Sequence, residues 1–413
     1  MASARKNHAG SNEAAPPAAP GQQVRRRLVL NFPGFEPTDS VAQIGRLRYC
    51  ADHTGKIWGF SVSGEAGHWE EGTHHALAEL SADGGNWHTD MRLIQFRWND
   101  IVHAYERDSF PGGFLKNLGK YFAFFFDGTV RRYRKASWRY WGFTIYPLLL
   151  ALIFFAVVFA ALWLATGSIW INFAVSLVAT LLACKWPGNR LYVPTTIADW
   201  GFARDMVDRS NPEIEGRFAE FGKTIVEEIT ASDHDEIVIV GHSFGSLWAV
   251  TALALALGEK PDLLTGRRVA FLALGSSMLK IALAPGARHI RDHWQRLARE
   301  ENLFWHEIQT KDDLIAFYKC DPFEEVAIAP PAQNEAGGGY KITRIRFSKG
   351  VAKKRYRKMR KSFYTTHRQY ILYYDKRVSF DYMLRLFGPF SVRSLADGGD
   401  VPDWLDKDGS IRA

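Results

Sequence analysis

Residues Glu236 to Leu257 read EIVIVGHSFGSLWAVTALALAL, and this stretch decides the fold of the chain. Its first five residues form a short β-branched run that predicts a buried strand, whereas the segment from Ser246 onward is apolar, helix-length and closed by Gly258. Between them lies Gly241-His242-Ser243-Phe244-Gly245. A serine at a tight strand-to-helix turn needs small residues two before and two after it, because larger side chains would press against neighbouring backbone. The two glycines meet that need, which makes Ser243 the predicted nucleophile.

The surrounding elements strengthen a motif that is weak by itself. Asn211 and Pro212 are the expected cap and first-turn residues of a preceding helix. The apolar face of that helix consists of Ile214, Phe218, Phe221, Ile225 and Ile229. The helix that follows Ser243 is too short to span a bilayer, so we expect it to be buried beneath a sheet.

This order of helix, strand, Gly-His-Ser-x-Gly turn and helix resembles the α/β-hydrolase superfamily, in particular its lipase- and esterase-like members. The resemblance covers most of the chain from Arg25 to about Pro389, apart from a long apolar run near residue 160. It implies an α/β fold with a mostly parallel central sheet flanked by helices. It also implies an oxyanion hole made by backbone amides.

The resemblance places one oxyanion donor after an early strand. Arg27–Asn31 reads as that strand and leads into Phe32-Pro33-Gly34-Phe35, so the amides of Phe35 and Phe244 are the expected donors. The alternative is an ordinary strand-to-loop turn. Leu93–Trp98 is the next expected strand.

In this superfamily the triad acid follows the serine along the chain. After an expected strand at Arg268–Leu274, the next one, Leu303–Ile308, leads into Asp312 and Asp313. Similar membrane-associated hydrolases carry a Trp, an Asp eight residues later, an aromatic residue and Cys-Asp-Pro. Residues in those places here are Trp305, Asp313, Phe317 and Cys320-Asp321-Pro322. We therefore predict Asp313 as the acid, and the other aspartate as a solvated charge or turn cap.

The histidine is expected after one more strand, Tyr340–Phe347. His367 is the only histidine beyond that strand, and it is the predicted general base. A serine hydroxyl needs an imidazole to take its proton and a carboxylate to fix the imidazole tautomer. The alternative is a merely structural histidine.

A long apolar run predicts attachment to a membrane. Residues 143–184 contain no charged side chain. As one helix they would extend about 60 Å, roughly twice the hydrocarbon thickness, so we expect a hairpin of two spans. Thr166-Gly167-Ser168 is the only polar break, which gives helices at about 143–165 and 169–184. The alternative is a pair of buried core helices in a soluble protein.

Basic residues flank both outer ends of this run, at Arg131–Arg139 and Lys185–Arg190, while its tip carries none. The chain ends and the catalytic domain should therefore face the cytoplasm, which in a bacterium means the inner membrane. The expected segments are a disordered tail at 1–24, hydrolase parts at 25–135 and 191–395, the hairpin at 136–190 and a C-terminal tail at 396–413. The basic cluster Lys349–Lys361 suits an anionic membrane surface. Within it, Lys353–Lys361 is expected as an amphipathic helix on lipid headgroups, or as a plain solvated face, rather than as a nucleic-acid site.

No cofactor or metal is expected. A group of residues with metal-binding side chains lacks zinc or metalloprotease spacing and reads as an exposed loop; it comprises His68, Glu70, Glu71, His74, His75 and His88. The predicted function is hydrolysis of an acyl ester, presented in or near membrane lipids, through an acyl-enzyme on Ser243. Two alternatives remain open at this point: an acyltransferase that uses the same triad, and a membrane scaffold of hydrolase fold without turnover.

Overall fold

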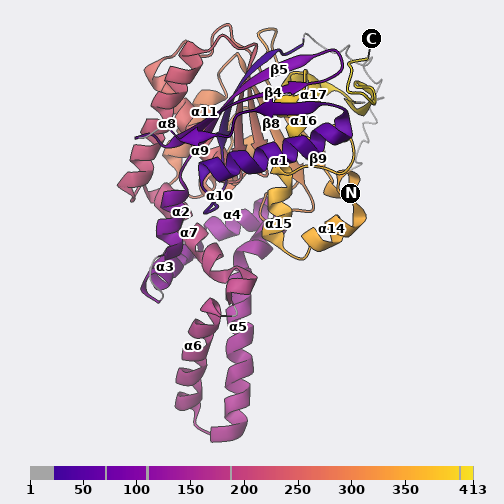
Figure 1. Ribbon diagram of the computed structural model, residues 1–413. Helices are drawn as coiled ribbons and strands as arrows, with labels where there is room; N and C mark the ends of the chain where they lie inside the picture. Colours follow the sequence, from indigo (N-terminus) through magenta and orange to yellow (C-terminus); the bar gives the residue numbers. More distant parts are fainter. Residues whose placement is uncertain (1–22, 70–71, 108–110, 187, 400, 413) are drawn as a thin grey trace, which may run out of the picture.

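The computed structural model describes residues 23–69, 72–107, 111–186, 188–399 and 401–412. The protein is a mixed α/β structure with a mostly parallel central sheet, and a pair of helices projects from one end of it (Figure 1). The expected disordered tail lies outside the described residues except for its last two. Of these, Val24 is buried, and its amide donates a hydrogen bond to the carbonyl of Pro389 at 2.8 Å.

The sheet follows the order β2-β4-β5-β1-β6-β7-β8-β9. Its parallel part consists of β5 (His88–Phe96), β1 (Arg26–Phe32), β6 (Glu236–His242), β7 (Val269–Leu274), β8 (Leu303–Thr310) and β9 (Gly339–Ile345). Each of the expected strands is present, with bounds that differ by a few residues. Strand β6 is buried along its whole length, as a central parallel strand covered on both faces should be.

The opposite edge of the sheet is antiparallel and corrects one expectation. The segment from His68 to His88, expected as an exposed loop, contains β3 (His68–Trp69) and the long strand β4 (His75–Asp83), and β2 (Ser61–Gly64) precedes it. Strand β4 pairs with β5 and is mostly buried; one of its faces consists of Ala76, Ala78, Leu80 and Ala82, all of them buried. Alanine is a poor strand former, so tertiary burial rather than local propensity makes this strand.

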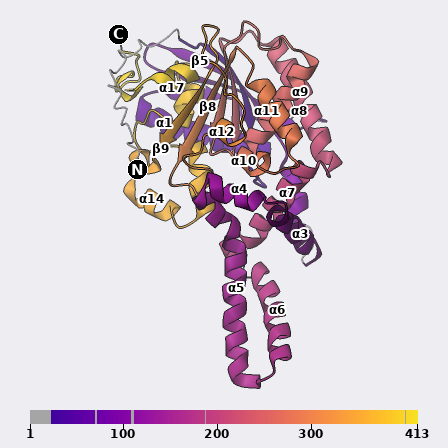
Figure 2. The same ribbon diagram turned by 180° about the vertical axis from the view of Figure 1, so that it is seen from behind.

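Helices cover both faces of the sheet (Figures 1 and 2). One face carries α1 (Ser40–Trp58), α16 (Tyr382–Phe387) and α17 (Val392–Asp397), and the other carries α8 (Pro212–Ala231), α9 (Gly245–Glu259) and α11 (Arg288–Leu297). Asn211 caps α8, and its side chain accepts from the amide of Glu213. Helix α9 is buried along most of its length, as expected, but it continues through Gly258 to Glu259.

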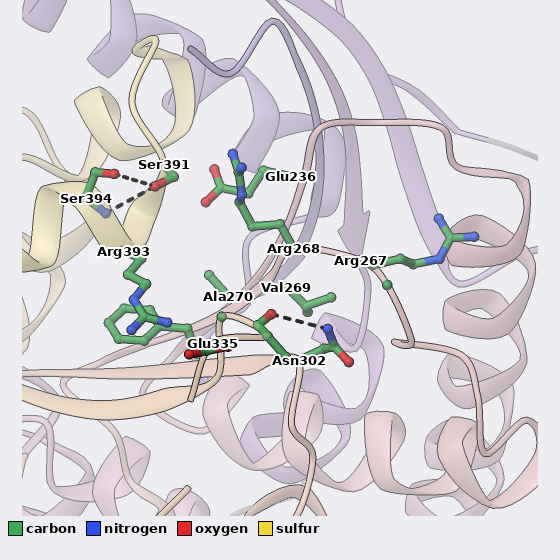
Figure 3. A pocket seen from close by; sticks show the side chains of 14 residues that line it. Glu236, Arg267, Arg268, Val269, Ala270, Asn302, Glu335, Ser391, Arg393 and Ser394 are labelled. Atoms are coloured by element: carbon green, nitrogen blue, oxygen red, sulfur yellow. Dashed lines mark hydrogen bonds between the residues drawn. The ribbon is translucent and has the colours of Figure 1, made fainter. Parts of the chain in front are cut away.

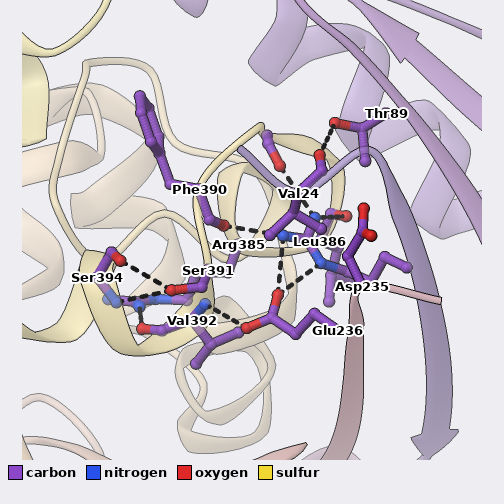
Figure 4. A network of polar contacts seen from close by, with 12 residues as sticks. Val24, Thr89, Asp235, Glu236, Arg385, Leu386, Phe390, Ser391, Val392 and Ser394 are labelled. Atoms are coloured by element: carbon purple, nitrogen blue, oxygen red, sulfur yellow. Dashed lines mark hydrogen bonds and ion pairs between the residues drawn. The ribbon is translucent and has the colours of Figure 1, made fainter. Parts of the chain in front are cut away.

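A buried ion pair ties the C-terminal segment to the start of the sheet (Figure 4). The Arg27 guanidinium contacts the Glu236 carboxylate at 2.9 Å, and both side chains are buried. Arg27 also donates to the carbonyls of Leu386, Gly388 and Phe390, while Glu236 accepts from the amide of Val392. Because each charge has several partners, the desolvation cost of burying it is offset. The loops after α16 therefore belong to the same core as β1 and β6.

Among the described residues, seven helices lie between β5 and α8 in the sequence. They are α2 (Asn99–Arg107), α3 (Gly112–Phe126), α4 (Thr129–Ala136), α5 (Trp138–Thr166), α6 (Ile169–Lys185), the 3-10 helix η1 (Gly188–Leu191) and α7 (Val193–Asp208). Helices α5 and α6 run side by side away from the body, whereas α4 and α7 lie between them and the sheet (Figures 1 and 2).

Helix α5 is long and apolar enough to cross a membrane. Its segment Trp138–Ala165 has 28 residues, an 18-residue window with mean hydropathy 2.9, and none of that window buried. Helix α6 has 17 residues and is only a shorter apolar helix. Among the described residues, one helix rather than the expected two therefore meets the length and composition of a span. Helix α6 ends at Lys185 because Trp186, which precedes a proline in the sequence, is extended.

The inserted helices contact the carboxyl end of the parallel strands. The hydroxyl of Tyr133 in α4 donates to the carbonyl of Lys280, in the segment after β7. The thiol of Cys320, after β8, donates to the carbonyl of Ala136 at 3.1 Å. Arg139, in the first turn of α5, donates to the carbonyl of Lys311, directly after β8. The apolar helix α5 therefore leaves the body at the carboxyl end of the parallel strands, where the loops after β6, β7 and β8 lie.

Candidate functional site

Ser243 lies at the sharp turn from β6 into α9. Its φ is 56°, a left-handed backbone conformation that residues other than glycine rarely adopt and that strand-to-helix nucleophile turns require. A Cβ on Gly241 would meet the Cα of Ser246 at 2.3 Å, and one on Gly245 would meet the carbonyl oxygen of Phe32 at 1.9 Å. Both glycines are therefore required by close backbone approach, as the sequence predicts.

The loop after β1 lies against this turn. Phe32 pairs with Gly241 across β1 and β6, and a Cβ on Gly34 would stand 3.1 Å from the Cβ of Ser243. The rings of Phe35 and Phe244 lie 6.2 Å apart. Among the described residues, neither amide of these two phenylalanines donates to another protein group. The two candidate oxyanion donors are thus on adjacent segments.

The structure brings Asp313 and His367 together. Asp313 follows β8 and is fully buried, and its Oδ2 accepts a hydrogen bond from Nδ1 of His367 at 2.7 Å. Its other oxygen accepts the amide of Ile315 at 2.8 Å. His367 ends α15 (Phe363–His367) and is buried. Because Nδ1 carries the proton in this contact, Nε2 is left as the basic nitrogen.

Asp312 points elsewhere. Its Oδ1 accepts the hydroxyl of Tyr356 at 2.8 Å, and its Oδ2 accepts the amide of Phe347 at 3.0 Å. These contacts hold the loop after β8 against α13 (Phe347–Gly350) and α14 (Lys353–Met359). The two adjacent aspartates therefore differ in geometry, and Asp313 alone contacts the histidine.

The serine and the histidine are not hydrogen-bonded to each other in this state. Ser243 Oγ lies 3.1 Å from the Oγ of Ser277, in the segment after β7, and the amide of Ser277 donates to the carbonyl of Ser243 at 3.2 Å. Nε2 of His367 is buried without a hydrogen-bond partner among the described residues. Catalytic hydrogen bonds are often formed only when substrate is bound.

His242 and Tyr370 hold the histidine segment against the sheet. Nε2 of His242 donates to the carbonyl of His367 at 3.2 Å, and their rings lie 4.8 Å apart. Burial and the neighbouring imidazole of His367 keep the pKa of His242 well below its usual value, so this donor stays neutral. The hydroxyl of Tyr370, in η2 (Arg368–Ile371), accepts the amide of Thr310 at 3.0 Å. His242 thus supports the site from the variable position of the motif.

A buried ion pair lies next to the candidate oxyanion donors. Nζ of Lys280, in α10 (Met278–Ala282), donates to Asp199 in α7 and stands 3.9 Å from the centre of the Trp200 ring and 5.0 Å from that of Phe244. Burial lowers the pKa of Lys280 and raises that of Asp199, and their mutual contact opposes both shifts. The pair fixes α7 over the nucleophile turn.

Sequence reasoning missed Ser277, Lys280 and Asp199. The sequence did contain a signal for Ser277 and Lys280, because both follow the carboxyl end of a strand next to β6. Residues that bind ligands in parallel α/β sheets usually lie at this end of the strands. Asp199 had none, since it comes from an inserted helix whose position over the sheet is a tertiary property.

The site is closed in this structure. Ser243 is 6% exposed and His367 is 4% exposed. Beside the turn, the rings of Phe35 and Phe202 lie 5.6 Å apart, and both contact the ring of Phe244.

An open cavity lies at the opposite end of the parallel strands, where β6 and β7 begin. It has a volume of about 680 Å³ and is lined by the first residues of β6 and β7, Glu236 and Val269, together with Asn302 and Arg393 (Figure 3). It contains none of the predicted site residues. Its arginines have protein partners: Arg267 donates to the carbonyl of Ser232 and Arg393 to that of Gly338.

Within the part of the chain that the structure describes, no group of three or more His, Cys, Asp or Glu side chains is arranged to hold a metal ion. Glu70 and Glu71 lie outside the described residues.

Comparisons with known proteins add no assignment: no family model, no curated protein and no solved structure matches this chain.

Proposed function

We propose that the protein is a membrane-anchored serine hydrolase of α/β-hydrolase fold that cleaves an acyl ester. One observation carries the proposal: a buried Asp313–His367 pair, with Nε2 of the imidazole unpartnered, packs against the strained turn that holds Ser243. The position of this turn between a parallel strand and a buried helix supports the same assignment.

In the proposed reaction, Ser243 Oγ rotates from Ser277 towards Nε2 of His367 and attacks the ester carbonyl. The imidazole takes the serine proton and returns it to the leaving alcohol, while Asp313 holds the imidazole tautomer and stabilises its charged form. The amides of Phe35 and Phe244 stabilise the oxyanion of the tetrahedral intermediate. Water then attacks the acyl-enzyme and releases the acid.

We also propose that both α5 and α6 enter the membrane and that the body faces the cytoplasm. The basic side chains before α5 and after α6 support this orientation, because such residues favour the cytoplasmic side. An alkaline phosphatase fusion at the C-terminus tests it in a bacterial host: no activity is expected, and an active fusion would contradict the orientation.

Labelling with a fluorophosphonate probe tests the chemistry. The wild-type protein should be labelled, and Ser243→Ala should not be. Ser277→Ala is the matched control, since it removes the neighbouring hydroxyl 3.1 Å away and should leave a protein that is still labelled on Ser243. Peptide mapping of the adduct identifies the labelled serine. Absence of labelling in a folded wild-type protein would favour a scaffold without turnover.

A further inference from the structure

A second pocket lies behind the Asp313–His367 pair. It has a volume of about 390 Å³ and is lined by Arg139, Lys311, Asp312, Tyr356, Arg360 and Lys361, with Leu314, Phe363 and Thr366 completing its wall. Its walls come from the first turn of α5, the loop after β8, and the segment from α14 to α15. None of the three proposed catalytic residues lines it.

The charges in this pocket are unbalanced. Four of its side chains are basic, and among the described residues none of the four forms an ion pair with a carboxylate. The single acid, Asp312, has its Oδ1 engaged by Tyr356 and its Oδ2 by the amide of Phe347. Nε of Arg139 is buried and lacks a hydrogen-bond partner, although the same guanidinium donates to the carbonyl of Lys311. Converging unpaired cations and an unsatisfied guanidinium donor fit an anion with several acceptor oxygens.

The location indicates the origin of that anion. Helices α14 and α15 lie at the end of the body from which α5 and α6 project, and the views from front and back agree on this (Figures 1 and 2). Arg139 belongs to the first turn of α5, the helix with the length and composition of a membrane span. Clusters of Lys and Arg next to such a helix bind anionic headgroups.

We propose that this pocket binds a phosphate group, supplied by the headgroup of an anionic membrane lipid. Arg139 and Lys311 hold it from the side of α5 and β8, and Arg360 and Lys361 hold it from the end of α14. Such a ligand bridges the loop that carries Asp313 and the helix that carries His367, because Asp312 and Thr366, their immediate neighbours, are in the wall. Binding does not require that Ser243 be catalytic, so this site and the proposed hydrolysis can fail separately.

The experiment measures binding by full-length protein that carries Ser243→Ala, so that no probe is consumed. Phosphatidic acid is titrated in phosphatidylcholine nanodiscs, with retained lipid counted by native mass spectrometry. Inorganic phosphate is titrated by calorimetry on the same sample. Arg360→Gln with Lys361→Gln removes two charges from the pocket. Lys353→Gln with Lys354→Gln removes two exposed charges from the first turn of α14, outside the pocket, and is the matched control.

One bound phosphatidic acid is expected, weakened at least tenfold by the pocket pair and less than twofold by the control pair. Binding of inorganic phosphate with the same residue dependence, without preference for phosphatidic acid, would support the phosphate site but overturn its lipid source. Equal losses in both pairs would reduce the effect to general surface charge and overturn the pocket. So would absence of binding by either probe to a wild-type pocket whose circular dichroism and melting temperature are those of folded protein.

Discussion

At the residue scale, two adjacent aspartates in the loop after β8 make different contacts. Asp312 and Asp313 are chemically identical and consecutive, yet the first ties the loop to α13 and α14 while the second contacts the imidazole. The sequence alone could narrow the acid to this loop but could not separate the two by residue type. The preference for Asp313 depended on a family pattern; Asp313 is the one of the two that contacts His367, and its role as the acid stays a prediction.

Asp313→Asn should abolish most activity while preserving the fold. The amide would donate to Nδ1 of His367 and stabilise the tautomer that cannot accept the serine proton, so turnover should fall roughly ten-thousandfold. Steady-state hydrolysis of an ester that wild type cleaves measures this.

Asp312→Asn is the control for that change. The asparagine side chain keeps one oxygen that accepts from Tyr356 or Phe347. Turnover should therefore fall by less than tenfold, which corresponds to less than about 1.4 kcal/mol of activation free energy. If Asp312→Asn proved the more damaging of the two, the proposed acid would be wrong. Equal mild losses would place the acid elsewhere.

At the element scale, α9 begins under a steric constraint and ends without one. Gly245→Ala would put a Cβ 1.9 Å from the carbonyl oxygen of Phe32, so β1 and the nucleophile turn would have to separate. We expect a loss of at least about 3 kcal/mol in unfolding free energy, in the range of severe overpacking. Thermal or denaturant unfolding of the purified protein measures it.

Gly258→Ala, near the other end of the same helix, is the matched control. Its Cβ would have Arg296 Nη1 as its nearest neighbour at 3.8 Å, which is ordinary contact. Alanine has the higher helix propensity, so this change should stabilise the protein by up to about 1 kcal/mol. A Gly245→Ala protein as stable as wild type would contradict the close approach of β1 and α9.

A second prediction for the elements concerns β8. Glu307 is buried in this strand, its Oε2 lacks a hydrogen-bond partner among the described residues, and burial raises its pKa from 4.5 to about 8. The folded protein therefore binds a proton that the unfolded chain releases above pH 4.5. The contribution of Glu307 to the free energy of unfolding is fully present below pH 4.5 and is lost as the pH rises towards 8.

Glu307→Gln removes this titration and keeps the shape of the side chain. The variant and wild type should melt at similar temperatures at pH 5, and the variant should melt several degrees higher at pH 8. Melting curves in the same detergent across this range decide it. A constant difference at all pH values would show that Glu307 does not titrate in this window.

The elements also show how far local sequence reaches. The parallel strands from β6 to β9 were predicted because each is a short apolar or alternating run near a turn. Strand β4 was missed because its alanines favour helix, and its formation depends on pairing with β5, which a local pattern does not contain. The bounds expected for the second apolar helix, about 169–184, agree with α6 to within one residue, but its 17 residues are fewer than a membrane span needs.

For the whole molecule, the sequence could predict that a serine, an acid and a histidine each come after a strand, in that order along the chain, but not which contacts hold the start of α5 beside them. That placement comes from contacts such as the stacked rings of Tyr140 and Phe317, 3.9 Å apart, and the edge contact of Phe143 with Phe363 at 5.6 Å. Phe363 begins the helix that ends with His367. The first turns of α5 and the helix that carries the proposed general base, His367, therefore pack against each other.

This arrangement leads to a prediction about substrate presentation. The proposed active site and the start of α5 lie at the same sheet edge, so a substrate that enters from the bilayer surface has the shorter path. For full-length protein, kcat/KM should be at least tenfold higher for a long-chain ester in mixed micelles than for a short soluble ester. Replacing residues 149–182 with a glycine-serine linker keeps Tyr140, Phe143 and Tyr146 in the body and removes the projecting helices. This variant should lose the preference while it still hydrolyses the short ester, because the Asp313–His367 pair remains supported. If both proteins prefer the soluble ester and anionic lipid changes neither rate, the helices serve only as an anchor and access from the membrane is excluded.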